Sequence, residues 1–192
     1  MNIRTTATAA TLALMLALSG CAPGADTDDM PGMDHDDSSE SAEFDSADVM
    51  FAQMMIPHHE QAVEMSNVLL AKDGIDEDVT ALAERIKAAQ QPEIELMEEW
   101  LDDWEAEMPM DGMDHGDGMM SQDDMAALED AAGDEASALF LEQMIEHHEG
   151  AIIMAEGEVE AGQDPDAVAL AEKIIEDQTA EIEEMKQLLD EL

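Results

Sequence analysis

The stretch that decides the fold is FAQMMIPHHEQAVEM, residues 51–65, which returns 89 residues later as FLEQMIEHHEGAIIM, residues 140–154. At about 100° per residue, one helical face of each copy collects phenylalanine, methionine, histidine and alanine. In the first copy this stripe consists of Phe51, Met55, His58, Ala62, Met65 and Leu69. Such a stripe on a single helix is typical of a core. Its return with adjacent histidines and a following methionine favours a metal-binding role.

The segments that follow each copy also repeat. LAERIKAAQQPEIELMEEWL, residues 82–101, matches LAEKIIEDQTAEIEEMKQLL, residues 170–189. Gln90 and Met97 are seven residues apart and share one face, so they are placed to face Met65 and His58 across a helical hairpin. The alternative is that they are ordinary core residues.

The periodicity is helical throughout, and capping residues, glycines and prolines give the limits of the helices. We expect helices over residues 46–72, 77–104, 135–160 and 165–192, with a short helix between Ser121 and Gly133. Two hairpins packed together predict an all-α, ferritin-like, antiparallel four-helix bundle, in which facing helices hold metal sites. Pro57 and Pro92 should weaken the first two helices.

The N-terminus resembles an export signal. Residues 1–20 have an apolar run and no acidic residue, and the run is too short to cross a membrane. The sequence Leu-Ser-Gly-Cys ending at Cys21 resembles the cleavage and acylation site of bacterial lipoproteins. The prediction is a lipid anchor that holds the protein on the outer face of the cytoplasmic membrane or in the periplasm. The alternative is an ordinary signal peptide with a chance cysteine.

Cysteine and charge limit the chemistry. Cys21 is the only cysteine, which excludes an internal disulfide and thiolate metal sites. The net charge of −44 repels nucleic acid and anionic lipid, so we expect no nucleic-acid partner and membrane contact only through the N-terminal lipid. Most of the acidic residues are expected to form a solvated surface.

Two biased segments flank the first repeat: an acidic tether at residues 21–45, which we expect to be disordered, and a linker at residues 105–120. Repeat one then covers residues 46–104, and repeat two covers residues 121–192. Both biased segments contain Gly-Met-Asp-His without helical periodicity, which indicates either low-complexity drift or weak metal capture. The residues that would capture metal are Met33, His35, Met110, Met113, His115, Met119 and Met120.

The joint pattern Met-Ile-x-His-His-x-x-Ala, Leu-Ala-x-x-Ile and Gln-x-x-Glu-Ile-x-x-Met resembles the domain-of-unknown-function family 305 over residues 46–192, in two tandem copies. This family is ferritin-like in fold and includes the CopM-like copper-binding proteins, so the resemblance implies an exported copper-binding bundle linked to copper tolerance. The implied metal ligands are His58, His59, Met55, Met65, Met97, His147, His148, Met144, Met154 and Met185. Gln143 departs from the pattern, because repeat one has Met54 there.

The residue types point to copper independently. Thioethers select Cu(I), while imidazole binds Cu(I), Cu(II) and zinc, and all six histidines lie in the paired motifs or the linkers. We expect reversible binding of copper, mainly as Cu(I), with storage or transfer to a partner and no catalysis. The sequence leaves open whether the His pairs form one site or two. The alternatives are a ferritin-like oxidase of iron or copper and a structural envelope lipoprotein without metal. A di-iron centre would need a Glu-x-x-His motif that repeat one lacks at its His pair.

Overall fold

The structure is a computed structural model that describes residues 44–108 and 118–192. In these two ranges all regular structure is helical, and no strand occurs. The five helices found there are α1 (Ser46–Leu70), α2 (Glu77–Asp103), α3 (Gln122–Asp130), α4 (Gly133–Ala161) and α5 (Pro165–Glu191). This confirms the predicted all-α class, and each helix lies close to its predicted limits. None of the helices in the described ranges is long and apolar enough to span a membrane.

The helices begin where the sequence provides caps. Asp45 and Asp48 form a capping box at the start of α1, and Ser121 and Asp124 form another at the start of α3. Asp164 caps α5, whose first residue is a proline. These side chains accept hydrogen bonds from backbone N–H groups that have no partner within the helix. Local sequence therefore sets the start of these three helices.

Two prolines lie inside helices without ending them. α1 continues through Pro57 and α2 continues through Pro92. Each proline removes one backbone hydrogen bond, to the carbonyl four residues earlier. The expected weakening does not divide either helix, because both are packed along their length against neighbours.

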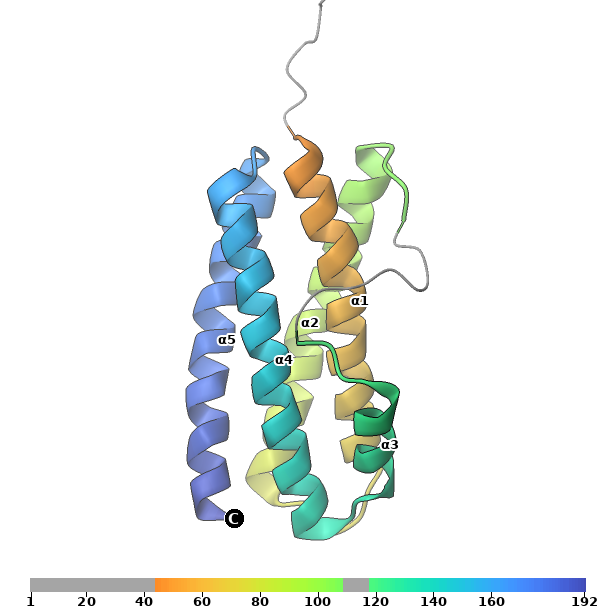
Figure 1. Ribbon diagram of the computed structural model, residues 1–192, viewed down its shortest axis with the longest axis vertical. Helices are drawn as coiled ribbons and strands as arrows, with labels where there is room; N and C mark the ends of the chain where they lie inside the picture. The colour runs from red at the N-terminus through yellow and green to blue at the C-terminus, as the bar shows by residue number, and fades with distance from the viewer. Residues whose placement is uncertain (1–43, 109–117) are drawn as a thin grey trace, which may run out of the picture. The chain divides into compact units, whose positions relative to one another are not determined.

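The four long helices form two antiparallel hairpins, α1 with α2 and α4 with α5 (Figure 1). The hairpins meet chiefly where α1 lies antiparallel to α4, and the short α3 packs against α1 and α4 near one end of the pair. Helices α1 and α4 carry the two copies of the repeated motif. The topology therefore brings the two copies together, although they are distant in the sequence.

The apolar core is divided into two clusters. The first, named here the Met65 cluster, includes Met65 and Leu69 of α1 and Phe140 and Met144 of α4. The second, the Met55 cluster, includes Phe51 and Met55 of α1 with Ala151 and Ala155 of α4, among others. The histidine pairs fall between these two sets along both helices. Polar imidazoles thus separate two apolar halves of the core.

The folded unit extends beyond the limits predicted from composition. Phe44, assigned above to the tether, stacks on Trp104 with ring centroids 5.0 Å apart, and Asp45 caps α1. Met120, assigned to the flexible linker, is 7% exposed and belongs to the Met65 cluster. Its backbone is paired with the Gln61 amide in both directions, at 2.7 and 2.9 Å. The linker prediction is therefore wrong at Met120, because a glutamine on α1 binds the backbone at that point.

A buried acidic pair fixes the start of α1 against the turn between α4 and α5. Oδ1 of Asp48 accepts hydrogen bonds from the N–H groups of Gln163 and Asp164, both at 2.9 Å. Burial raises the pKa of Asp48, but these donors, the Asp45 N–H and the Glu158 carboxyl outweigh it and hold the pKa below 3.8. For Glu158, burial and then Asp48 raise the pKa to about 8. Near neutral pH Asp48 is therefore ionised, whereas Glu158 keeps its proton.

Candidate metal centre

His58 of α1 and His147 of α4 meet in the centre of the bundle. Both side chains are fully buried, and their ring centroids are 3.7 Å apart at an interplanar angle of 42°. They come together because each motif places its first histidine on the buried stripe and the two helices are antiparallel. With the equally buried His59 and His148, they form what we call the histidine layer. The two His pairs therefore meet at the α1–α4 interface.

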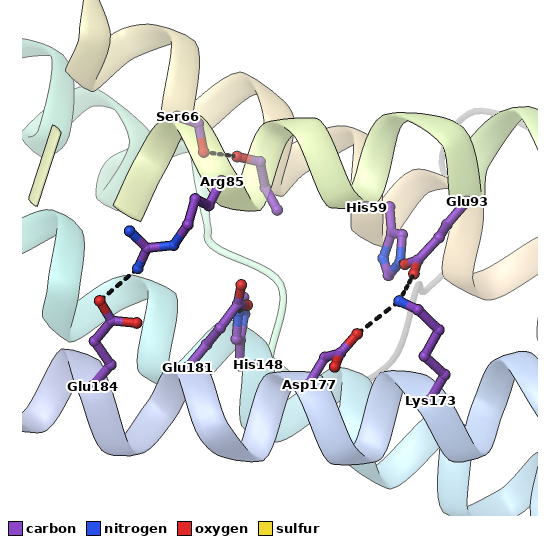
Figure 2. A network of polar contacts seen from close by, with 10 residues as sticks. His59, Ser66, Arg85, Glu93, His148, Lys173, Asp177, Glu181 and Glu184 are labelled. Carbon is purple, nitrogen blue, oxygen red and sulfur yellow. Dashed lines mark hydrogen bonds and ion pairs between the residues drawn. The ribbon is translucent and has the colours of Figure 1, made fainter. Parts of the chain in front are cut away.

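The second histidine of each pair binds a carboxylate within its own hairpin. Nε2 of His59 lies 2.9 Å from Oε2 of Glu93, and Nε2 of His148 lies 2.7 Å from Oε2 of Glu181. Figure 2 shows both pairs, with the glutamates reaching inward from α2 and α5. Because a carboxylate accepts, each Nε2 donates its proton, and in the neutral ring each Nδ1 keeps a lone pair. Both Nδ1 atoms are buried and make no hydrogen bond to a described residue.

The two carboxylates are held differently. Nζ of Lys173 lies 2.9 Å from Glu93 and 2.6 Å from Asp177. Burial raises the pKa of Glu93, but His59 and Lys173 outweigh it, so the pKa stays below 4.5. The hydrogen bond to Asp177 raises the pKa of Lys173. In the other half of the bundle no lysine or arginine pairs with Glu181 among the described residues.

In the described ranges, Glu181 has no such cation because Arg85 pairs with another glutamate. Arg85 occupies the position in the second-helix repeat that corresponds to Lys173, but it pairs with Glu184 at 2.5 Å (Figure 2). The side chain of Glu181 is 20% exposed, against 11% for Glu93. The two His–Glu pairs are therefore equivalent in hydrogen bonding and unequal in charge and access.

A pocket of about 220 Å³ between α2 and α5, the α2–α5 pocket, is lined in part by these carboxylates. Its lining includes Glu93 and Glu181 together with Gln90 and Gln178. The two glutamines are each 3% exposed, and their Oε1 atoms have no hydrogen-bond partner among the described residues. The α2–α5 pocket is therefore bordered by the two carboxylates that bind His59 and His148 and by two glutamines with unpaired acceptor oxygens.

The methionines divide between the two apolar clusters. Met55 and Met97 belong to the Met55 cluster, and Met154 packs against it. The Met65 cluster contains Met65, Met144 and Met185. Met97 of α2 therefore lies with Met55 of α1. Each cluster mixes methionines from both repeats, because the antiparallel helices bring the start of one motif beside the end of the other.

The environment of His147 favours neutral imidazole. Burial lowers the pKa of His147 well below 6.5, and His58, His148 and His59 lower it further, whereas a contact with the His58 backbone acts in the opposite direction. Neutral imidazole is the form that binds metal. In residues 44–108 and 118–192, no three His, Cys, Asp or Glu side chains are grouped closely enough to hold one metal ion.

Most of the remaining predicted residues lie outside the described part of the chain. These are Cys21, Met33, His35, Met110, Met113 and His115. Met119 is half-buried. Glu93 and Glu181 were missed as functional residues, although the sequence carried a signal for them: each follows the repeated glutamine by three residues. Their contact with histidine depends on the register between two helices, which the repeat does not specify.

Comparison with known proteins identifies the family. The profile of the family described as Domain of unknown function (DUF305) matches residues 48–189. The chain belongs to the DUF305 family. The match covers both halves of the bundle in one stretch, and the division into two tandem copies remains an interpretation of the sequence. A search of curated proteins found no match.

Solved DUF305 structures are similar to the chain. A DUF305 protein from Streptomyces coelicolor has 36% identity and a TM-score of 0.71, covering 76% of this chain and 93% of its own. A DUF305 fragment from Deinococcus radiodurans has 29% identity and a TM-score of 0.69, covering 78% of this chain and 99% of its own. CopM in its Cu(I)-bound form has 31% identity and a TM-score of 0.66, covering 75% of this chain and 96% of its own. CopM has also been solved with Cu(II) and with silver bound.

Proposed function

We propose that this DUF305 protein is an exported copper-binding protein that holds copper, mainly as Cu(I), inside the bundle and contributes to copper tolerance or homeostasis. The observation that carries the proposal is the histidine layer, in which four imidazoles are fully buried. The Nδ1 atoms of His59 and His148 make no hydrogen bond there. A buried acceptor without a partner costs free energy. A metal ion would use these lone pairs.

The surrounding ligand types favour copper over harder metals. Met55 and Met144 precede His58 and His147 by three residues, so each lies about one helical turn away, and both are fully buried. Thioethers select Cu(I), and imidazole serves both oxidation states. The similarity to CopM, which has been solved with Cu(I) and Cu(II) bound, supports the same choice of metal. The proposed role is reversible binding without turnover.

Glu93 and Glu181 would act as outer-shell partners of the metal ligands. A carboxylate that accepts from one ring nitrogen fixes the tautomer and makes the other nitrogen more basic. The observed distances of 2.9 and 2.7 Å to Nε2 suit this role. Glu93 and Glu181 would therefore leave the Nδ1 lone pairs of His59 and His148 available to bind the metal.

Export and capture complete the proposal. Residues 1–20 would direct the chain across the membrane, and acylated Cys21 would anchor it on the outer face of the cytoplasmic membrane or in the periplasm. The linker methionines and histidines would collect copper weakly and pass it to the bundle, which would store it or deliver it to another carrier. The linker ligands proposed for this step are Met33, His35, Met110, Met113, His115 and Met119.

An anaerobic Cu(I) titration of the full-length protein against a competing chelator tests this function. A variant in which His58, His59, His147 and His148 are changed to alanine should lose the tight sites and keep weak linker binding. The matched control changes His35 and His115 to alanine. This removes the histidines of the tether and the linker, and it should preserve tight binding. Circular dichroism checks that each variant is helical. Equal chelator competition by the native protein and the four-histidine variant would contradict the proposal.

A further inference from the structure

A second pocket lies between α1 and α4, away from the histidine layer. This α1–α4 pocket has a volume of about 220 Å³, and its lining includes three methionines, Met50, Met54 and Met154. Met50 is 58% exposed, and the other two are half-buried. Three methionine side chains therefore border one solvent-accessible pocket.

Core packing does not account for two of these three methionines. Met50 and Met54 belong to neither apolar cluster, whereas Met154 packs against the edge of the Met55 cluster. Met50 and Met54 are four residues apart, which places them on the same face of α1. Met154 lies across from them on α4. An exposed, unbranched thioether on so acidic a surface has no evident stabilising role.

The corresponding positions in the other half of the bundle carry different chemistry. Leu139 and Gln143 replace Met50 and Met54 in the second copy of the motif. The amide of Gln143 donates to the backbone carbonyl of Asp124 at 2.9 Å, which attaches α3. One end of the bundle therefore uses this face to hold a helix, and the other end leaves a pocket lined by sulfur.

The lining of the pocket suits a soft monovalent cation. Neutral thioethers select Cu(I) and Ag(I) over zinc, magnesium or calcium. The rest of the lining consists of Ala47, Phe51, Gly157, Glu158 and Ala161, and a Cβ added at Gly157 would meet no atom within 4 Å. The net charge of −44 draws cations toward the surface.

We propose that the α1–α4 pocket is a second soft-metal site, in which Met50, Met54 and Met154 bind Cu(I) or Ag(I) through sulfur alone. The proposal relies on the proposed function only for the supply of copper. The site is separate from the histidine layer and requires no imidazole. It provides a solvent-exposed position at which the metal is held outside the core.

Methyl NMR of the full-length protein, labelled with [methyl-13C]methionine and titrated with Ag(I), tests this site directly. The signals of Met50, Met54 and Met154 should shift together as one site fills. Met54→Leu keeps the side-chain volume and removes one sulfur, so it should weaken binding at the other two at least tenfold. Gly157→Leu keeps all three sulfurs and fills the pocket, and it should also weaken binding. Met125→Leu, on α3, is the control and should leave the three shifts unchanged.

Titration of the variant that lacks His58, His59, His147 and His148 distinguishes this inference from the proposed function. The pocket signals should still respond to Ag(I) there, even though the tight Cu(I) sites are lost. If the pocket methyls do not shift, or if Met54→Leu leaves the shifts of Met50 and Met154 intact, the pocket is not a metal site, whatever the histidine layer binds. If the pocket responds while the native histidines bind no Cu(I), the proposed function fails and the pocket site remains.

Discussion

Replacing Glu158 with glutamine should stabilise the metal-free protein at alkaline pH. Glu158 is 2% exposed, and burial followed by the neighbouring Asp48 raises its pKa from 4.5 to about 8. In the folded protein, Glu158 therefore keeps its proton in a pH range where an unfolded glutamate has lost it. Glutamine has nearly the same shape and never ionises.

The sign of the effect follows from proton binding. Between pH 4.5 and about 8 the folded state holds one more proton than the unfolded state, so the free energy of unfolding falls as pH rises through this window. The full shift would correspond to an upper limit of about 5 kcal/mol. Because two adjacent carboxyl groups can separate or admit water once both are charged, we expect a loss of about 2 kcal/mol. Glu158→Gln should avoid this loss.

Urea denaturation followed by circular dichroism at pH 5, 7 and 9 measures the effect. The free energies of unfolding of native protein and Glu158→Gln should agree within about 1 kcal/mol at pH 5 and diverge by pH 9, with the variant more stable. Glu160→Gln, on the exposed side of the same helix, is the control and should follow the native protein. If native protein and Glu158→Gln lose the same stability between pH 5 and pH 9, the assignment of the raised pKa to Glu158 is wrong.

Three further predictions concern the site, the linker and the core. Changing Glu93 or Glu181 to glutamine should weaken Cu(I) binding about ten- to a hundredfold in chelator competition, and unchanged affinity would exclude the outer-shell role. Gly118→Ala should destabilise the fold by about 1–3 kcal/mol in urea denaturation. The reason is that φ is +94° and the new Cβ would lie 2.7 Å from Cα of Gly150. A change within error would show that residue 118 can shift freely. Met55→Ala should cost about 2–5 kcal/mol without metal, since Met55 is fully buried; a much smaller loss would indicate a core that collapses around the gap.

The sequence predicted the local features well because they depend on neighbouring residues. Asp45, Ser121 and Asp164 cap helices, and each needs only the N–H groups that follow it in the chain. The stripe from Phe51 to Leu69 is buried throughout, because the helical period alone places its members on one face. The composition of residues 105–120 was misleading at Met120, whose burial depends on a distant glutamine.

The sequence by itself determined that the chain is helical, where most helices start, and that histidine and methionine share the buried face of two similar helices. Only the tertiary structure decided that His58 meets His147 while His59 binds Glu93, and that Met55 and Met65 lie in different clusters. The physical reason is that helical periodicity fixes the direction of a side chain around its own axis. Which side chain it meets depends on the register and spacing of neighbouring helices, and these are set by the packing of the whole core at once.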